Sequence, residues 1–262
     1  MKKNKQSQLI VALDVDTLGE VQKLVDTLGD YVDIYKVGSQ LFSACGPVAV
    51  RFIQARGKKV FLDLKYHDIP NTVASAVKVA MGLSSAVERY QESSFTKDPH
   101  VPNVVQKIGG KNKPTSLFMY TLHTVGGLEM MQAAVAAGRK AAEEMGAVKP
   151  LAVGVTVLTS EQKTENTLGK VLERALLAQK AGMDGVVASC EESAFLRKEF
   201  GENFIIVTPG IRPLGEEKQD QQRVATPAEA IRCGSDFLVV GRPIVKAANP
   251  LQAAKKILEE MQ

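Results

Sequence analysis

The chain has 262 residues, of which 45% are hydrophobic, so it is long enough to bury a sizeable core. Its 33 basic and 29 acidic residues are spread along the sequence and leave a formal net charge of +4. This balance mildly favours anionic ligands, but no basic tract typical of nucleic-acid binding is present. No apolar run approaches the roughly 20 residues of a membrane span. The basic start is not followed by the long apolar segment that a signal peptide contains. We therefore expect a soluble, cytoplasmic protein that binds neither nucleic acid nor membranes.

Short β-rich runs alternate with helical segments from one end of the chain to the other. Helical periodicity is clearest over Gly127–Met145, Leu168–Ala181 and Pro243–Met261. The expected strands are Leu9–Val15, Val32–Val37, Lys59–Leu64, Ser116–Leu122, Leu151–Val157, Gly185–Ala188, Phe204–Val207 and Phe237–Val240. Eight strands, each followed by a helix, predict one (β/α)8 TIM barrel domain over residues 1–262. The alternative is an open doubly wound sheet, which the lack of a Gly-x-Gly-x-x-Gly turn after the first strand disfavours.

An insertion over residues 84–114 separates the third helix from the fourth strand. It mixes Ser, Lys, Asn, Pro and Gly with scattered apolar residues, and short helices are expected at Ala86–Gln91 and Asn103–Lys107. A helix-to-strand connection lies at the amino-terminal face of a barrel, opposite the face that carries active sites. We therefore expect this insertion to serve stability or contacts rather than catalysis.

The densest group of charges closes the third strand, in the run Asp63-Leu64-Lys65-Tyr66-His67-Asp68. Side chains alternate along a strand, so Asp63 and Lys65 are expected on one face, and the two carboxylates keep Lys65 protonated. Charges this dense at the end of a buried strand are costly unless they neutralise one another or meet a ligand. The run predicts a catalytic site, with a structural ion pair as the alternative.

Polar groups also follow most of the other strands, and a barrel brings such groups together at its carboxyl face. They include Asp14, Lys36, His123, Thr156, Thr159, Ser160, Ser189, Thr208, Pro209, Arg212, Gly241 and Arg242. A glycine and an arginine at a helix start, as in Gly241-Arg242-Pro243, suit a phosphate group. Thr208-Pro209-Gly210-Ile211-Arg212 adds a second arginine, and the polar segment from 214 to 225 has the composition of a lid.

Histidines and cysteines offer no metal pattern. His67 and His123 fall in different strand-end loops without a clear third ligand. Cys45, Cys190 and Cys233 are far apart in the sequence and lack metal-ligand spacing. We expect buried, reduced cysteines and no metal.

Three separated motifs carry a family resemblance. Asp-x-Lys-x-x-Asp followed by Ile-Pro-Asn-Thr, over residues 63–72, resembles the orotidine 5'-phosphate decarboxylase family. Thr-Pro-Gly-Ile-Arg-Pro and Gly-Arg-Pro-Ile follow in the family's order, so the resemblance extends from Leu9 to about Val245 outside the insertion. It implies decarboxylation of orotidine 5'-phosphate to UMP and CO2 without a cofactor, the last step of de novo UMP biosynthesis.

The resemblance also implies roles for individual residues. Lys65 would protonate C6 of the pyrimidine, with Asp63 near the substrate carboxylate and Lys36 completing the charged array. Asp68 would reach into the neighbouring site across a homodimer interface. The implied substrate-binding residues are Asp14 at the ribose, Thr159 at the pyrimidine, Arg212, Gln222 and Arg242 at the phosphate, together with Lys36, Thr72, Pro209 and Gly241.

Three other functions stay open at this point. The short Asp-x-Lys-x-x-Asp core also occurs in phosphosugar decarboxylases and aldolases that need a divalent cation. A nucleotide-binding barrel without turnover is a second alternative, although clustered carboxylates near an anionic ligand do not suit a pure binder. A scaffold dominated by the 84–114 insertion is the third.

Overall fold

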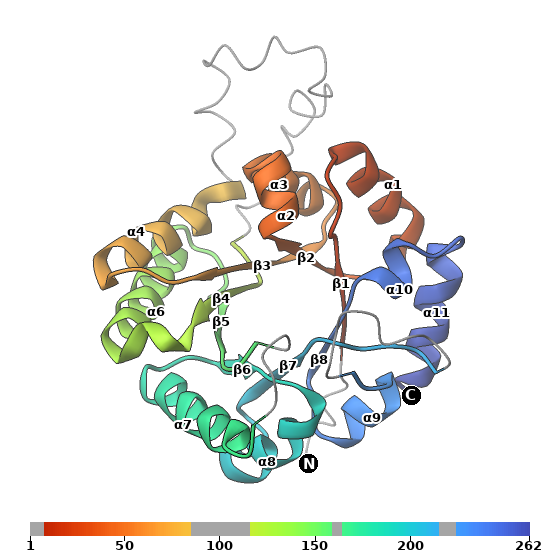
Figure 1. Ribbon diagram of the computed structural model, residues 1–262. Helices are drawn as coiled ribbons and strands as arrows, with labels where there is room; N and C mark the ends of the chain where they lie inside the picture. Colours follow the sequence, from red (N-terminus) through yellow and green to blue (C-terminus); the bar gives the residue numbers. More distant parts are fainter. Residues whose placement is uncertain (1–7, 85–115, 159–163, 215–223) are drawn as a thin grey trace, which may run out of the picture.

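Eight parallel strands form one closed barrel in a computed structural model that describes residues 8–84, 116–158, 164–214 and 224–262. Each strand pairs with the next along the chain, and β8 pairs with β1, which closes the ring seen in Figure 1. The strands are β1 (Gln8–Ala12), β2 (Ile34–Gly38), β3 (Lys59–Tyr66), β4 (Met119–His123), β5 (Leu151–Val155), β6 (Gly185–Val187), β7 (Ile205–Thr208) and β8 (Phe237–Val240). The predicted (β/α)8 barrel is confirmed, and the open sheet is excluded.

Helices surround this ring on the outside (Figure 1). The α-helices are α1 (Leu18–Leu28), α2 (Ser39–Cys45), α3 (Pro47–Ala55), α4 (Pro70–Met81), α6 (Gly127–Glu144), α7 (Thr167–Lys180), α8 (Cys190–Phe200), α9 (Pro227–Arg232), α10 (Arg242–Val245) and α11 (Pro250–Glu260). Short 3-10 turns are η1 (Gly29–Tyr31), η2 (Gly82–Ser84) and η5 (Thr124–Gly126). Among the described residues, no helix is both long and apolar enough to cross a membrane.

Strand alternation divides the apolar residues between two layers. On β1, Ile10 and Ala12 belong to a cluster that fills the barrel, together with Phe61, Met119 and other inward residues. Val11, between them in sequence, belongs to the larger cluster between the strands and the helices. This division follows from the two-residue period of a strand. It leaves the carboxyl ends of the strands as the place where polar side chains can gather.

The predicted helix over Pro243–Met261 is wrong in one respect, because the structure divides it into α10 and α11. Asn249 has an extended backbone and its side chain accepts a hydrogen bond from the Gln252 amide at 3.1 Å, which caps α11. Pro250 takes the first helical position, where its missing N–H costs nothing, and it disfavours a helical Asn249. The Asn-Pro pair therefore starts a new helix.

The insertion predicted over 84–114 lies almost wholly outside the described residues. Ser84 ends η2, and the chain is described again from residue 116. The helices expected at Ala86–Gln91 and Asn103–Lys107 also fall outside, so the role of this segment stays a prediction.

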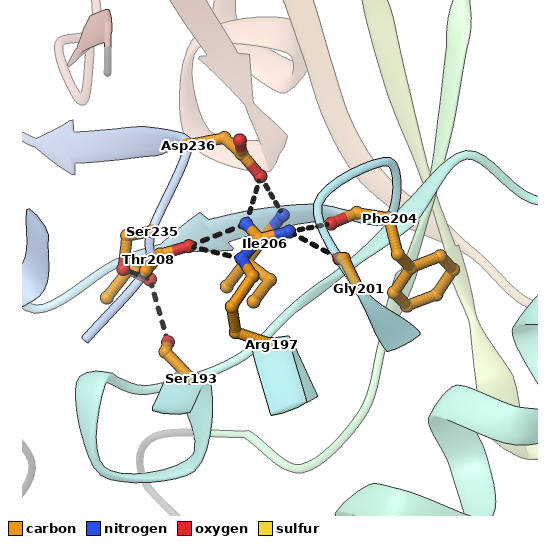
Figure 2. A network of polar contacts seen from close by, with 9 residues as sticks. Ser193, Arg197, Gly201, Phe204, Ile206, Thr208, Ser235 and Asp236 are labelled. Atoms are coloured by element: carbon orange, nitrogen blue, oxygen red, sulfur yellow. Dashed lines mark hydrogen bonds and ion pairs between the residues drawn. The ribbon is translucent and has the colours of Figure 1, made fainter. Parts of the chain in front are cut away.

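Arg197 anchors α8 to the barrel at the starts of β7 and β8, on the face opposite the strand ends that carry the predicted site. Figure 2 shows its contacts from close by. Its guanidinium donates to the carbonyls of Gly201, Phe204 and Gly234 over 2.6–3.2 Å and pairs with Asp236 at 2.8 Å. The same Asp236 oxygen accepts from the Ile206 amide at 2.8 Å. Both charged side chains are largely buried, with 13% and 9% of their surface exposed. This network gives the amino-terminal face a structural role.

Candidate functional site

A cavity of about 220 Å³ opens at the carboxyl ends of the strands. Apolar residues from β5 to β8 form part of its wall, including Val155, Val187 and Val207. Six charged side chains also line it, namely Asp14, Lys36, Asp63, Lys65, Arg212 and Arg242. The tertiary structure therefore brings together most of the charged residues that the sequence predicted for the site.

The end of β3 carries the centre of this charged set. Lys65 Nζ lies 2.9 Å from both carboxylate oxygens of Asp63, so the two side chains share a face as predicted. The strand is not regular here, however. Its pairing with β4 shifts register between Leu62 and Tyr66, and Lys65 has a φ of 50°. Lys65 is the one non-glycine residue with positive φ in the described part of the chain. A backbone held in this region is strained and often belongs to a functional site.

Asp63 is held as a carboxylate by its neighbours. Burial, the largest single influence, raises the pKa of Asp63, but the Lys36 and Lys65 cations act in the opposite direction. Hydrogen bonds from Lys65 and from the Thr121 hydroxyl also lower the pKa, which lies below its ordinary value as a result. The carboxylate is therefore ionised at neutral pH although only 13% of its side-chain surface is exposed.

Lys36 joins this pair to the end of β1. Its Nζ lies 3.6 Å from Asp63 Oδ2 and 3.2 Å from Asp14 Oδ1. Asp14 follows β1 by two residues, since that strand ends at Ala12 rather than at the predicted Val15. Its side chain is about half exposed, which leaves it accessible to a ligand in the cavity. Asp14, Lys36, Asp63 and Lys65 therefore form one continuous array of alternating charge.

The predicted phosphate end lies on the same cavity, at β7 and β8. Pro209, Gly210, Arg212, Gly241 and Arg242 all line it. Arg212 is buried, and its backbone amide donates to the Ala225 carbonyl at 2.9 Å. The Ala225 amide in turn donates to the Gly210 carbonyl at 3.2 Å. These bonds join the two ends of the segment that was predicted to be a lid.

Two predicted residues lie away from the cavity. Asp68 is exposed, and its Oδ1 accepts a hydrogen bond from the Ile69 amide at 2.6 Å. Within one chain, Asp63 contacts Lys65 and Asp68 does not, so the predicted role of Asp68 in a neighbouring site stays a prediction. Thr72 is exposed in the first turn of α4. Thr159, Ser160 and Gln222 fall outside the described residues, and their roles stay predictions.

His67 lies beside His123, and Cys190 lies beside Cys233. The rings of His67 and His123 lie 5.7 Å apart, centre to centre. Among the residues described, no three His, Cys, Asp or Glu side chains are placed to hold a metal ion. Cys190 Sγ lies 3.0 Å from Cys233 Sγ, although the two are far apart in sequence, and burial raises the pKa of Cys190 to about 12. No motif in the sequence indicated this thiol pair.

Thr121 is a polar residue beside the charged array that the sequence motifs did not include. It lies on β4, where Met119 and Thr121 point into the barrel and Tyr120 and Leu122 point out. A threonine at an inward position next to the charged end of β3 was the available indication. Its hydroxyl contacts both Asp63 and the Lys65 backbone.

The sequence of this chain also matches a known protein family. The family model for the orotidine 5'-phosphate decarboxylase / HUMPS family matches residues 7–87 and 101–257. The chain belongs to this family.

Relatives of this family match along nearly the whole chain. The orotidine 5'-phosphate decarboxylases of Moorella thermoacetica and Geobacter sulfurreducens are 41% and 43% identical to it, over 98% of this chain and 93% and 96% of theirs. The crystal structure of orotidine 5'-phosphate decarboxylase from Lactobacillus acidophilus has a TM-score of 0.73 and 31% identity, covering 98% of this chain and 99% of that one. The family resemblance of the sequence motifs is thus confirmed.

Proposed function

We propose that this enzyme decarboxylates orotidine 5'-phosphate to UMP and CO2 without a cofactor, as the last step of de novo UMP synthesis in the cytoplasm. The observation that carries the proposal is one cavity lined by both a Lys-Asp-Lys array and two arginines. Family membership and relatives that bear this enzyme's name support the same reaction.

Lys65 is the proposed proton donor. As CO2 leaves, the electron pair of the broken bond stays on C6 of the pyrimidine, and Lys65 Nζ gives C6 a proton to complete UMP. Lys65 then regains a proton from solvent. Its ion pair with Asp63, at 2.9 Å, holds the ammonium group at the cavity. Lys36 adds a second cation beside the same carboxylate and stabilises the negative charge that develops at C6.

The phosphate end supplies binding energy at a distance from the reacting carbon. Arg212 and Arg242 are the proposed phosphate ligands, because a guanidinium makes charge-assisted hydrogen bonds to phosphate oxygens. Energy from this remote contact can organise the site for the transition state. Asp14 is the proposed partner of a ribose hydroxyl, and Pro209 and Gly241 complete the wall near the substrate.

A homodimer is proposed from the placement of Asp68 and Thr72. Both are exposed in a single chain, although they belong to the motif that also supplies Asp63 and Lys65. In a second copy of the chain, they would complete the neighbouring site. Ile69, between them in sequence, has 66% of its surface exposed, which suits a contact with another copy.

The test is a spectrophotometric decarboxylation assay with orotidine 5'-phosphate, run with and without EDTA. We expect turnover that EDTA does not change, and a kcat loss of at least about 10²-fold in Lys65→Ala. Lys149→Ala is the matched control, since Lys149 pairs with Asp184 at 2.7 Å away from the cavity and its loss should leave kcat unchanged.

Other outcomes would select the alternatives. Near-normal kcat in Lys65→Ala would exclude Lys65 as the proton donor. Turnover that EDTA abolishes would contradict the cofactor-free reaction. UMP binding without turnover would favour a nucleotide-binding barrel. A folded protein that neither binds UMP nor turns over the substrate would favour a phosphosugar substrate.

A further inference from the structure

Thr121 occupies the point where β3 and β4 lose their regular pairing. Leu62 pairs with Tyr120, and the next pair is Tyr66 with Leu122. Three residues of β3, from Asp63 to Lys65, therefore lie opposite Thr121 alone. An irregularity of this kind redirects the side chains of the longer strand. Here it brings the ends of Asp63 and Lys65 together at the cavity.

The hydroxyl of Thr121 makes a hydrogen bond to each end of this irregular segment. Its Oγ1 accepts from the Lys65 amide at 2.8 Å and donates to Asp63 Oδ1 at 3.0 Å. The residue is fully buried, so solvent does not compete for either bond. The first bond holds the Lys65 backbone at its positive φ, and the second fixes one oxygen of the carboxylate.

We infer that Thr121 is a positioning residue that aims Lys65 and Asp63 at the reacting carbon. The inference rests on the proposed decarboxylation, in which Lys65 donates the proton. Thr121 lines up the pair without touching the substrate itself, because it is fully buried and does not line the cavity. Its β-branched side chain has few rotamers, which keeps both bonds in place.

The chemistry requires a hydroxyl at this position. One atom must accept a hydrogen bond from an amide and donate one to a carboxylate, and a hydroxyl does both. Valine has nearly the same shape but can do neither, whereas serine keeps the hydroxyl and loses only a methyl group. The groups that face Asp63 are Lys36 from β2, Lys65 from its own strand and Thr121 from β4.

The experiment compares Thr121→Val and Thr121→Ser with the unmodified enzyme. Thr121→Val should lower kcat by about tenfold or more, the size expected when a hydrogen bond to a charged group is lost. UMP affinity should stay within about threefold, since the phosphate end is unchanged, and Thr121→Ser should keep most of the activity. The acid limb of the kcat–pH profile should move to higher pH in Thr121→Val, because Asp63 loses a bond to its ionised form.

Thr124→Val is the matched control. Thr124 is also buried, and its hydroxyl donates to the Val155 carbonyl at 2.7 Å without contacting the charged array. The Thr124→Val variant also loses a buried hydroxyl hydrogen bond, so it would reveal any general effect of such a loss on the enzyme. We expect its kcat and pH profile to match those of the unmodified enzyme.

A readout that needs no turnover separates this inference from the proposed function. The titration of Asp63, followed by NMR of ¹³C-labelled aspartate carboxyls, should move to higher pH in Thr121→Val. If the unmodified enzyme does not decarboxylate orotidine 5'-phosphate, the proposed function fails, and this titration still decides whether Thr121 orders Asp63. Unchanged kcat and unchanged titration in Thr121→Val would overturn the inference.

Folding of the variants is checked by circular dichroism and UMP binding. If Thr121→Val fails to fold, Thr121→Ala takes its place in the comparison with the unmodified enzyme. This variant removes the same hydroxyl without adding a methyl group. Failure of both variants to fold would show that the hydroxyl serves folding rather than aiming, and would also overturn the inference.

Discussion

Gly38→Ala offers a way to displace the charged array without removing any charge. Gly38 ends β2 and pairs in register with Asp63 of β3. Its backbone is extended, with φ of −94°, so alanine is tolerated there. A Cβ at this position would lie 2.8 Å from Lys36 Nζ, inside the 3.4 Å at which ordinary contact begins. The flexible end of Lys36 must therefore retreat by about 0.6 Å, the difference between these distances.

The size of the effect follows from the ion pair that this movement loosens. Lys36 Nζ and Asp63 Oδ2 are 3.6 Å apart, which corresponds to about 4.6 kcal/mol at an effective dielectric constant of about 20. If the whole retreat of about 0.6 Å lengthens this pair, its energy falls to about 4 kcal/mol. If the stabilisation of the developing charge by Lys36 falls by the same amount, kcat falls by about threefold. The partly exposed Asp14 contact is screened by solvent and adds little.

Steady-state kinetics and thermal unfolding of Gly38→Ala test this prediction together. Stability should stay equal or rise slightly, because alanine restricts the unfolded chain at a position it can adopt. Gly19→Ala at an exposed position of α1 is the control, since its Cβ would approach no atom closer than 4.0 Å, and its kcat should not change. Unchanged kcat in a folded Gly38→Ala would refute the role given to the Lys36 position.

The remaining predictions concern binding, stability and oxidation. Arg242→Ala should raise KM for the phosphorylated substrate far more than it lowers kcat, and an unchanged kcat/KM would contradict the phosphate assignment. Arg197→Met should lower the free energy of unfolding by about 3–5 kcal/mol in urea titrations, because it breaks a buried ion pair, whereas Lys140→Ala at an exposed pair should cost below about 1 kcal/mol. Oxidised glutathione should join Cys190 to Cys233 while two glutathione thiols form, and a disulfide-linked peptide absent from digests would refute the 3.0 Å pairing.

Much of the fold was predictable because its determinants are local. Short β-rich runs identified the strands, and their alternation with helical segments along the chain was enough to predict a closed parallel barrel. Errors occurred at boundaries, as where Pro243–Met261 was predicted as one helix. The Asn249-Pro250 pair that divides it is itself a local feature, so this error lay in the interpretation and not in the sequence.

The candidate site divides in the same way. The spacing of Asp63 and Lys65, and the glycine and arginine after β8, were visible as short motifs. The sequence could not place Asp68 and Thr72 relative to the cavity, because this depends on how α4 leaves the strand. Nor could it pair Cys190 at the start of α8 with Cys233, which follows the end of α9.

The sequence by itself determined the chemical groups of the site and the strands that carry them, since residue type and two-residue alternation are properties of neighbouring positions. Only the tertiary structure decided how those groups are aimed. The positive φ of Lys65 and the orientation of Asp63 depend on a hydroxyl from Thr121, more than fifty residues away along the chain. Such a contact exists only after the strands have paired, because the register between β3 and β4 is fixed by packing across the whole barrel.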